Sequence, residues 1–373
     1  MNIMPEKNKE SDILKKNNVD TPENEDKEEE VSEEETGPEP LGWNFIDEIF
    51  KKIYKNIEPL HYGNISPFGE KKLKGISVYD VKGKNPHWHF VTYGLSELYE
   101  KESENPEKSG YGLEFTFRLA KEESETEVPN WAINFLNNLA NYIFKTGNVF
   151  NEGHYLNTNG PIAANSNTNL KAVVFFKDAE LNKIYKSPNG SLKFLQVTGI
   201  THDELEAVIA WNTEKVTELL GLPLNITYLN RDSRITEEIL EKVKLGIETD
   251  GSSTRFLYVD KAELDTEFRY IFRLGALGAV SLSNLLRGVV LKSKILTLYS
   301  KYKITLQMSF ENRIEEKEYG YDIYFTKETA MEIADKIGPK AEMIILESFE
   351  GFDIIIEKSY IRDRYGKIVE VVG

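Results

Sequence analysis

Two stretches decide the fold, PHWHFVTYGLSELYE (residues 86–100) and SGYGLEFTFRLA (residues 109–120). The segment HWHFVTY within the first is aromatic and β-branched, which is typical of a strand. In the second, the apolar side chains Leu113, Phe115 and Phe117 alternate with polar ones and therefore point to one face of a strand. We expect a mainly antiparallel sheet to be built around these two strands.

Periodic patterns on both sides of these stretches predict helices and further strands. Helices are predicted at residues 43–57, 129–146, 201–220, 233–245 and 326–337. Further strands are predicted at residues 74–81, 172–176, 192–198, 302–310 and 319–325, and two or three short ones after residue 340. The pattern predicts an α+β protein with two domains, residues 41–265 and a smaller 266–373, each a mainly antiparallel sheet packed with helices.

The charge is unevenly distributed along the chain. The 373 residues carry a net charge of −16, and residues 1–40 alone hold 14 acidic and 5 basic side chains. Because this segment is poor in apolar residues, we expect a disordered acidic tail. The overall acidity argues against nucleic-acid and anionic-membrane partners, and the lack of Cys excludes disulfides and thiolate metal sites. No apolar run suits a signal peptide or a membrane span, so we expect a cytoplasmic protein.

A basic stretch contrasts with the acidic tail. Residues 268–310 contain no Asp or Glu. Their seven basic residues are Arg269, Arg273, Arg287, Lys292, Lys294, Lys301 and Lys303. One interpretation is solvated strand faces, and the other is a docking strip for an acidic partner or for the tail.

The sequence lacks the catalytic motifs that would indicate an enzyme. It contains no GxSxG, P-loop, HExxH or EF-hand pattern. His87 and His89 lie two apart on a predicted strand and so share a face. With His154 they form the rival hypothesis, a metal-dependent enzyme. No carboxylate lies nearby at metal-ligand spacing, so we predict neither metal, cofactor nor enzymatic activity.

The two opening stretches are similar to a signature of the Suppressor of fused family: a His-Trp-His strand, a Gly-Leu-Ser-acid-Leu-Tyr run and a Ser-Gly-aromatic-Gly strand. Further segments resemble the family in the same order. They are LANYIF, NVFNEGH, FLQVTGIT, Trp211-Asn212 and GIETDGSS, and more faintly residues 285–309. One departure is that Gly153 stands directly before His154, where animal members carry an acidic residue.

The resemblance implies a protein that binds proteins and catalyses nothing. Animal members sequester a transcription factor in the cytoplasm and clamp an extended peptide between two domains as an added strand. Bacterial members resemble immunity proteins that neutralise a cognate polymorphic toxin, and this chain resembles that compact type. The alternative is a cytoplasmic scaffold for an endogenous regulatory protein. The predicted partner-binding residues are His87, His89, Tyr93, Glu97, Tyr99, Glu152, His154 and Tyr155.

Overall fold

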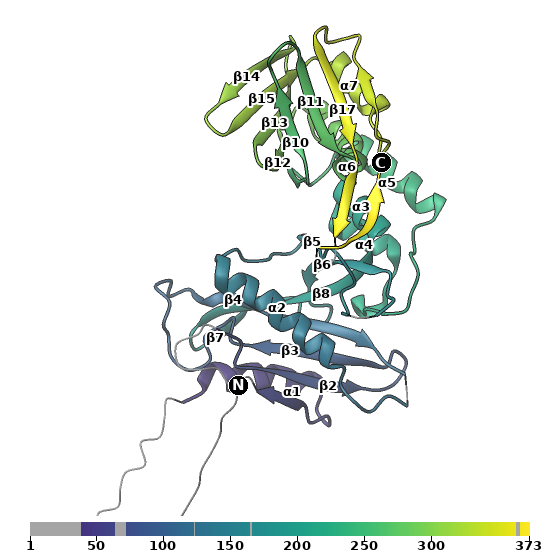
Figure 1. Cartoon of the computed structure of the whole chain (residues 1–373). Helices are drawn as coiled ribbons and strands as arrows, with labels where there is room; N and C mark the ends of the chain where they lie inside the picture. Colours follow the sequence, from purple (N-terminus) through teal and green to yellow (C-terminus); the bar gives the residue numbers. More distant parts are fainter. Residues whose placement is uncertain (1–38, 64–71, 123, 165, 363–365) are drawn as a thin grey trace, which may run out of the picture. The chain divides into compact units, whose positions relative to one another are not determined.

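The two stretches that decide the fold form the neighbouring antiparallel strands β3 (His87–Tyr93) and β4 (Lys108–Ala120). The computed structural model describes residues 39–63, 72–122, 124–164, 166–362 and 366–373. The strands lie inside an eight-stranded sheet with the order β1-β2-β3-β4-β8-β6-β5, and β7 pairs with β8 (Figure 1). Only the β4–β8 pairing in this sheet is parallel. The predicted acidic tail lies outside the described residues, apart from its last two positions.

The remaining strands of this sheet are β1 (Leu60–Gly63), β2 (Gly75–Val81), β5 (Tyr155–Asn157), β6 (Leu170–Lys177), β7 (Tyr185–Ser187) and β8 (Gly190–Thr201). Helix α2 (Asn130–Thr146) packs on the face that carries Phe115 and Phe117. Helix α1 (Leu41–Ile53) packs in a separate cluster with Tyr79, Val91 and Tyr93. The predicted alternation is confirmed, but both faces of β3 and β4 are buried.

A helical segment follows β8. It contains α3 (His202–Ala210), α4 (Thr213–Leu220), the 3-10 turn η1 (Pro223–Asn225) and α5 (Glu237–Asp250). A capping box of Thr201 and Glu204 starts α3. The single helix predicted over residues 201–220 is broken, because the Asn212 side chain accepts a hydrogen bond from the Lys215 backbone and starts a second helix.

The rest of the chain forms three small sheets with two helices and a 3-10 turn. One sheet contains β10 (Ala262–Asp265), β11 (Tyr270–Gly275), β17 (Phe352–Glu357) and β16 (Met343–Ile345) in that order. The second contains β14 (Arg313–Lys317), β15 (Gly320–Phe325), β13 (Lys303–Met308), β12 (Leu296–Tyr299) and β9 (Phe256–Tyr258). The third is the hairpin of β18 (Ser359–Arg362) and β19 (Ile368–Val372). The helices are α6 (Ala276–Gly288) and α7 (Lys327–Lys336), and η2 (Val290–Lys292) follows α6.

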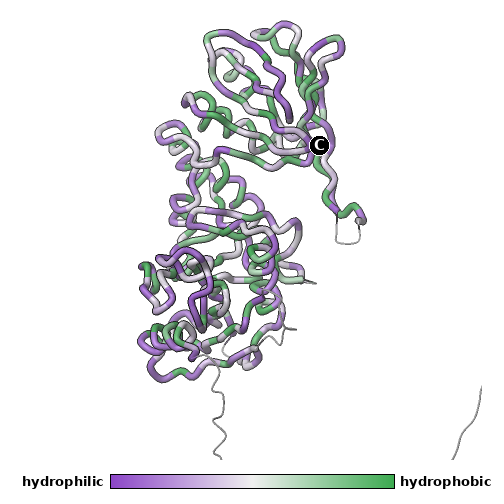
Figure 2. The backbone as a smooth tube through the Cα atoms, turned by 90° about the vertical axis from the view of Figure 1, so that its left-hand side faces the viewer, coloured by the Kyte–Doolittle hydropathy of each residue, from purple (hydrophilic) through white to green (hydrophobic). Residues whose placement is uncertain are grey.

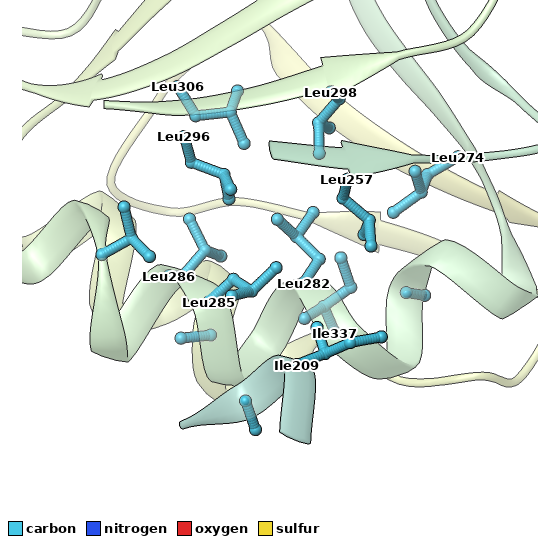
Figure 3. Packing of buried hydrophobic residues seen from close by; sticks show 14 of the residues in the cluster. Ile209, Leu257, Leu274, Leu282, Leu285, Leu286, Leu296, Leu298, Leu306 and Ile337 are labelled. Atoms are coloured by element: carbon cyan, nitrogen blue, oxygen red, sulfur yellow. The ribbon is translucent and has the colours of Figure 1, made fainter. Parts of the chain in front are cut away.

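Helix α6 lies inside the basic stretch, which was interpreted as strands. Its Leu282, Leu285 and Leu286 point toward Leu296 and Leu298 of the neighbouring sheet (Figure 3). These leucines recur at i, i+3 and i+4, a helical spacing that the long apolar run around them obscured. The stretch therefore contains strand, helix and strand, so its basic side chains do not share one strand face.

The observed architecture is α+β with mainly antiparallel sheets, as predicted. The predicted domain boundary after residue 265 falls between two paired strands, since Leu264 of β10 lies opposite Phe272 of β11. The largest hydrophobic cluster also includes residues from both sides, from Ala172 to Ile356. The division into two domains stays a prediction. Hydrophobic and hydrophilic residues are interspersed along the backbone (Figure 2), and no described helix is long and apolar enough to cross a membrane.

Candidate functional site

The predicted partner-binding residues fall into two groups, and the first begins on β3. His87, His89 and Tyr93 are buried and leave no surface for a partner, which corrects their predicted role. His87 Nδ1 donates to the Asn85 carbonyl at 2.7 Å, and the Tyr93 hydroxyl donates to Asp47 at 2.7 Å. The sequence pattern correctly placed the two histidines on one face, but it could not show that this face is covered.

His89 belongs to a buried network of charged side chains. Its Nδ1 shares a hydrogen bond of 2.7 Å with the Tyr54 hydroxyl, and its Nε2 lies 3.5 Å from Asp178. Arg118 donates to both carboxylate oxygens of Asp178, at 2.7 and 3.0 Å, and to Glu180 at 2.9 Å. Burial and the nearby Arg118 lower the pKa of His89 to about 3, so the imidazole is neutral near pH 7.

The GLSELYE turn after β3 is organised by Glu114 of β4. The carboxylate of Glu114 is fully buried and accepts hydrogen bonds from Thr92 Oγ1 (2.6 Å), the backbone of Gly94 (2.9 Å), and Ser96 Oγ and backbone (2.7 and 2.8 Å). Burial raises the pKa of Glu114 to about 7, although these donors act in the opposite direction. The carboxylate fixes the turn from within.

Glu97 and Tyr99 lie on this turn. The Glu97 carboxylate accepts hydrogen bonds from Lys101 and from the Glu102 and Ser103 backbones. Burial would raise its pKa, but these donors outweigh burial and lower it. Asn189 holds the turn through the carbonyls of Glu97 and Tyr99, at 3.0 and 3.1 Å. Only the Tyr99 ring, 40% exposed, reaches solvent as a large apolar surface.

The second group, Glu152, His154 and Tyr155, lies at the start of β5. The sheet order separates β5 from β3 by four strand positions, or about 19 Å, so the two groups form no common patch. Glu152 and His154 are exposed. Glu152 pairs with Lys193 at 3.2 Å and Lys177 at 3.5 Å. His154 Nδ1 accepts from the Asn151 backbone at 3.3 Å, and burial and then Lys193 lower its pKa.

These positions also bear on the metal hypothesis. The rings of His87 and His89 are 6.2 Å apart, but His154 lies at the far end of the sheet. No group of three His, Asp or Glu side chains in the described part of the chain could hold a metal ion. The three histidines therefore do not form a common site.

Three segments that carry the family resemblance meet beside β5. Thr213 Oγ1 donates to the Gly153 carbonyl at 2.6 Å, and the Tyr155 hydroxyl lies 3.5 Å from Thr254 Oγ1. The Ser253 backbone donates to the Trp211 carbonyl at 2.8 Å. The Trp211 ring packs so tightly on α5 that a Cβ at Gly246 would lie 2.1 Å from it. The segments around residues 153, 211 and 246–254 thus form one junction.

This junction brings two open strand edges together. β5 ends the eight-stranded sheet, and β9, which starts two residues after Thr254, ends the five-stranded sheet. The Thr158 backbone N–H donates to the Lys171 carbonyl of β6. Because inward and outward backbone groups alternate along an antiparallel strand, the backbone groups of Tyr155 and Asn157 point outward. On β9, the Arg255 carbonyl accepts a backbone hydrogen bond from β12, and the Val259 N–H donates one to it. The backbone groups of Phe256 and Tyr258 therefore face outward.

Residues of β9 were missed as site candidates. Exposed Phe256 and Tyr258 form an aromatic cluster with half-buried Tyr299, and the rings of Tyr258 and Tyr299 stack with centroids 5.2 Å apart. A three-residue strand carries too few positions for a readable alternation. The resemblance of GIETDGSS just before it was the only sequence signal near this edge.

The three arginines of the basic stretch are paired with acids within the chain. Arg269 pairs with Asp353 at 2.9 Å, Arg273 with Glu357 at 3.2 Å, and Arg287 with Asp335. Lys292 donates to the Glu248 carbonyl. The carboxylates, remote in sequence, pair three of the seven bases, whereas Lys292 keeps its charge because a carbonyl is neutral. Exposed Lys292, Lys294, Lys301 and Lys303 remain a predicted docking surface.

Comparisons with known proteins agree with the resemblance. Residues 69–232 match the sequence model of the Suppressor of fused protein (SUFU) family. Suppressor of fused homologs of Homo sapiens and Mus musculus are each 33% identical over 206 residues, which cover 50% of this chain and 42% of each relative. The chain thus spans less than half the length of these curated relatives.

Solved structures show the same fold. The crystal structure of Drosophila Suppressor of Fused matches with a TM-score of 0.70 at 19% identity, over 86% of this chain and 97% of that one. A chain of the Sufu–Fu complex crystal structure matches with a TM-score of 0.51 at 26% identity, over 57% of this chain and 99% of that one. Residues 69–232 of this chain are thus similar to the Suppressor of fused family in sequence, and the chain shares its fold with solved Suppressor of fused structures.

Proposed function

We propose that this chain is a non-enzymatic module that sequesters a protein partner by taking an extended segment of it as an added strand at the edges of β5 and β9. The observation that carries the proposal is the junction of two open strand edges, joined by Tyr155 and Thr254. In strand addition, backbone hydrogen bonds provide affinity and alternate side chains provide selectivity, so no catalytic group is needed.

Side chains around the junction are suited to select the partner segment. On the β5 side they are charged or polar, with Glu152 and His154 exposed. On the β9 side they are aromatic, and Tyr258 is 75% exposed. An extended segment with apolar or aromatic side chains toward β9 and polar ones toward β5 would match both edges.

We further propose that the partner is a toxin domain, that the chain is its immunity protein of the compact bacterial type, and that it acts in the cytoplasm. The support is the resemblance to compact bacterial family members. The alternative is a scaffold that holds an endogenous regulatory protein. Co-purification from the native host with mass spectrometry separates the two, since recovery of a host regulator and no toxin would overturn the immunity assignment.

The strand-addition mode has its own test at Asn157. The Asn157→Pro variant removes one outward backbone N–H. The sheet itself should tolerate proline at this edge position, because this N–H takes no part in the pairing of β5 with β6. Loss of one bond should weaken binding of the co-purified partner by about 0.5–1.5 kcal/mol, or roughly 2- to 13-fold.

The matched control is Asn157→Ala, which loses the same side chain but keeps the N–H. Binding by isothermal titration should follow the proline variant only. Equal affinities for the two variants would contradict strand addition at β5.

A further inference from the structure

A second binding surface lies beside the strand edges. It is a hollow of about 1730 Å³, larger than the 300–1000 Å³ of pockets for small molecules. Its walls are helices α3, α5 and α6, the β18–β19 hairpin, and Asn157 of β5 with residues 159–164 and Lys171 of β6. The hairpin contributes Ile361, Val369 and Val372 to one wall. A hollow of this size suits a segment of another protein.

Each helix presents one stripe of side chains to the hollow. α3 presents Asp203, Glu206, Ala207 and Ala210, α5 presents Leu240, Val243, Lys244 and Ile247, and α6 presents Leu277, Val280, Asn284 and Arg287. The spacing is i, i+3, i+4 and i+7 on α3 and α5, and i, i+3, i+7 and i+10 on α6. Each set of side chains therefore lies on one face of its helix. The α6 face with Leu282, Leu285 and Leu286 packs into the core instead (Figure 3), so this second α6 stripe is open to an occupant.

The hollow has an acidic bias. Two ion pairs on its wall are internal, Lys171 with Glu370 at 3.9 Å and Arg287 with Asp335. The lining acids left after these pairs are Asp203, Glu206 and Glu248, against the single base Lys244. An occupant with positive charge would complement this excess.

Glu206 is central to this bias. One of its carboxylate oxygens accepts from Ser281 Oγ at 2.7 Å, and the other has only His202 Nε2 nearby, at 3.8 Å. Burial raises the pKa of Glu206, with the Ser281 hydrogen bond acting against it. The carboxylate therefore faces the hollow without a close cationic partner in the described structure.

The helical walls also restrict the backbone of the occupant. The backbone groups in the middle of α3, α5 and α6 are already bonded within each helix, so these walls offer no row of partners to an extended strand. Away from Asn157 on the β5 edge, a strand buried against these helices would leave polar groups unpaired, which costs free energy, whereas a helix satisfies its own.

We propose that this hollow binds an amphipathic helix that has apolar residues at i, i+3, i+4 and i+7 and Lys or Arg on the flank that meets Glu206. A helix about 10–12 Å in diameter that filled the volume would have about 10–15 residues. Such helix-in-groove recognition differs from strand addition, and it adds a second contact beside the β5 edge, which the hollow adjoins at Asn157.

The test uses a phage-displayed library of 18-residue helix-forming peptides, panned against the full chain. The expected peptides carry the apolar stripe and a Lys or Arg flank. Their synthetic copies should bind Glu206→Gln at least tenfold more weakly, and Leu240→Arg more weakly still, because Leu240 is a 51% exposed lining residue.

Two matched controls lie on α5 outside the hollow, Leu245→Arg at a 60% exposed position and Glu241→Gln. Both should bind the peptides like the unmodified chain. Peptides without basic residues, or equal binding to Leu240→Arg and Leu245→Arg, would overturn the proposal.

Discussion

The turn after β3 and the junction beside β5 were both recognisable in the sequence, yet the structure uses them in opposite ways. In the turn, polar groups of Glu97, Glu114 and Asn189 bond to the chain itself. At the junction, two strands end with backbone groups that face outward. The difference teaches that the most distinctive residues of this chain build the scaffold, while the backbone edges that we propose for binding have little sequence signature.

The largest expected effect concerns the buried scaffold, at the ion pair of Arg118 and Asp178. Arg118→Met removes the cation that holds Asp178, which is itself fully buried. An uncompensated buried charge of this kind costs about 3–5 kcal/mol in free energy of unfolding. Urea denaturation measures it, with Lys242→Met on the exposed face of α5 as a nearly neutral control. A loss below about 1 kcal/mol would show that the network is not structurally required.

The next effect concerns pH and the turn. Because burial raises the pKa of Glu114 to about 7, above an unfolded value near 4.5, its contribution is present below about pH 4.5 and is lost as pH rises through 7. The shift corresponds to stability on the order of 3 kcal/mol. Glu114→Gln should flatten the stability profile between pH 5 and 8, as measured by denaturation at each pH.

Glu97→Gln provides a control of opposite sign. The pKa of Glu97 is lowered, so its contribution is present above the unfolded pKa and is lost on acidification. A Glu114→Gln profile with the same slope as the unmodified chain would rule out Glu114 as the titrating group.

A smaller effect tests the junction itself. Gly246→Ala places a methyl group against the Trp211 ring, and such overpacking costs about 1–3 kcal/mol, partly offset by the better helix propensity of alanine, about 0.5–1 kcal/mol. Thermal denaturation should show a net loss near 1 kcal/mol. At Gly338 the space around a Cβ is open, and Gly338→Ala should stay within about 0.5 kcal/mol. Equal stability of both variants would contradict tight packing at the junction.

The smallest effect sharpens the comparison at the strand edges. Thr254→Val removes the hydroxyl that lies 3.5 Å from Tyr155. At this length the hydrogen bond is weak, so the free energy of unfolding should change by about 0.5 kcal/mol or less. A much larger loss, measured by the same denaturation, would mean that the contact is a main support of the scaffold.

The five longer strands of the eight-stranded sheet and most helix positions were predictable, because alternation and helical periodicity are local properties, whereas the short strands β1, β5 and β7 were not predicted. Burial of the second face was not, since α1 covers His89 and Tyr93 from a distant part of the chain. The same limit explains the basic stretch, because its arginines are paired by Asp335, Asp353 and Glu357 far along the sequence. Helix α6 was missed because apolar residues lie on two of its faces.

The brevity of β5 and β9, three residues each, limits what they can recognise. A neighbour that pairs with such an edge meets outward backbone groups at two residues only, so the recognised motif should be short, about five residues including its flanks. Short edges also resist unwanted pairing with other chains, because few consecutive backbone bonds are on offer. The chain can thus keep two edges open for a partner without promoting its own aggregation.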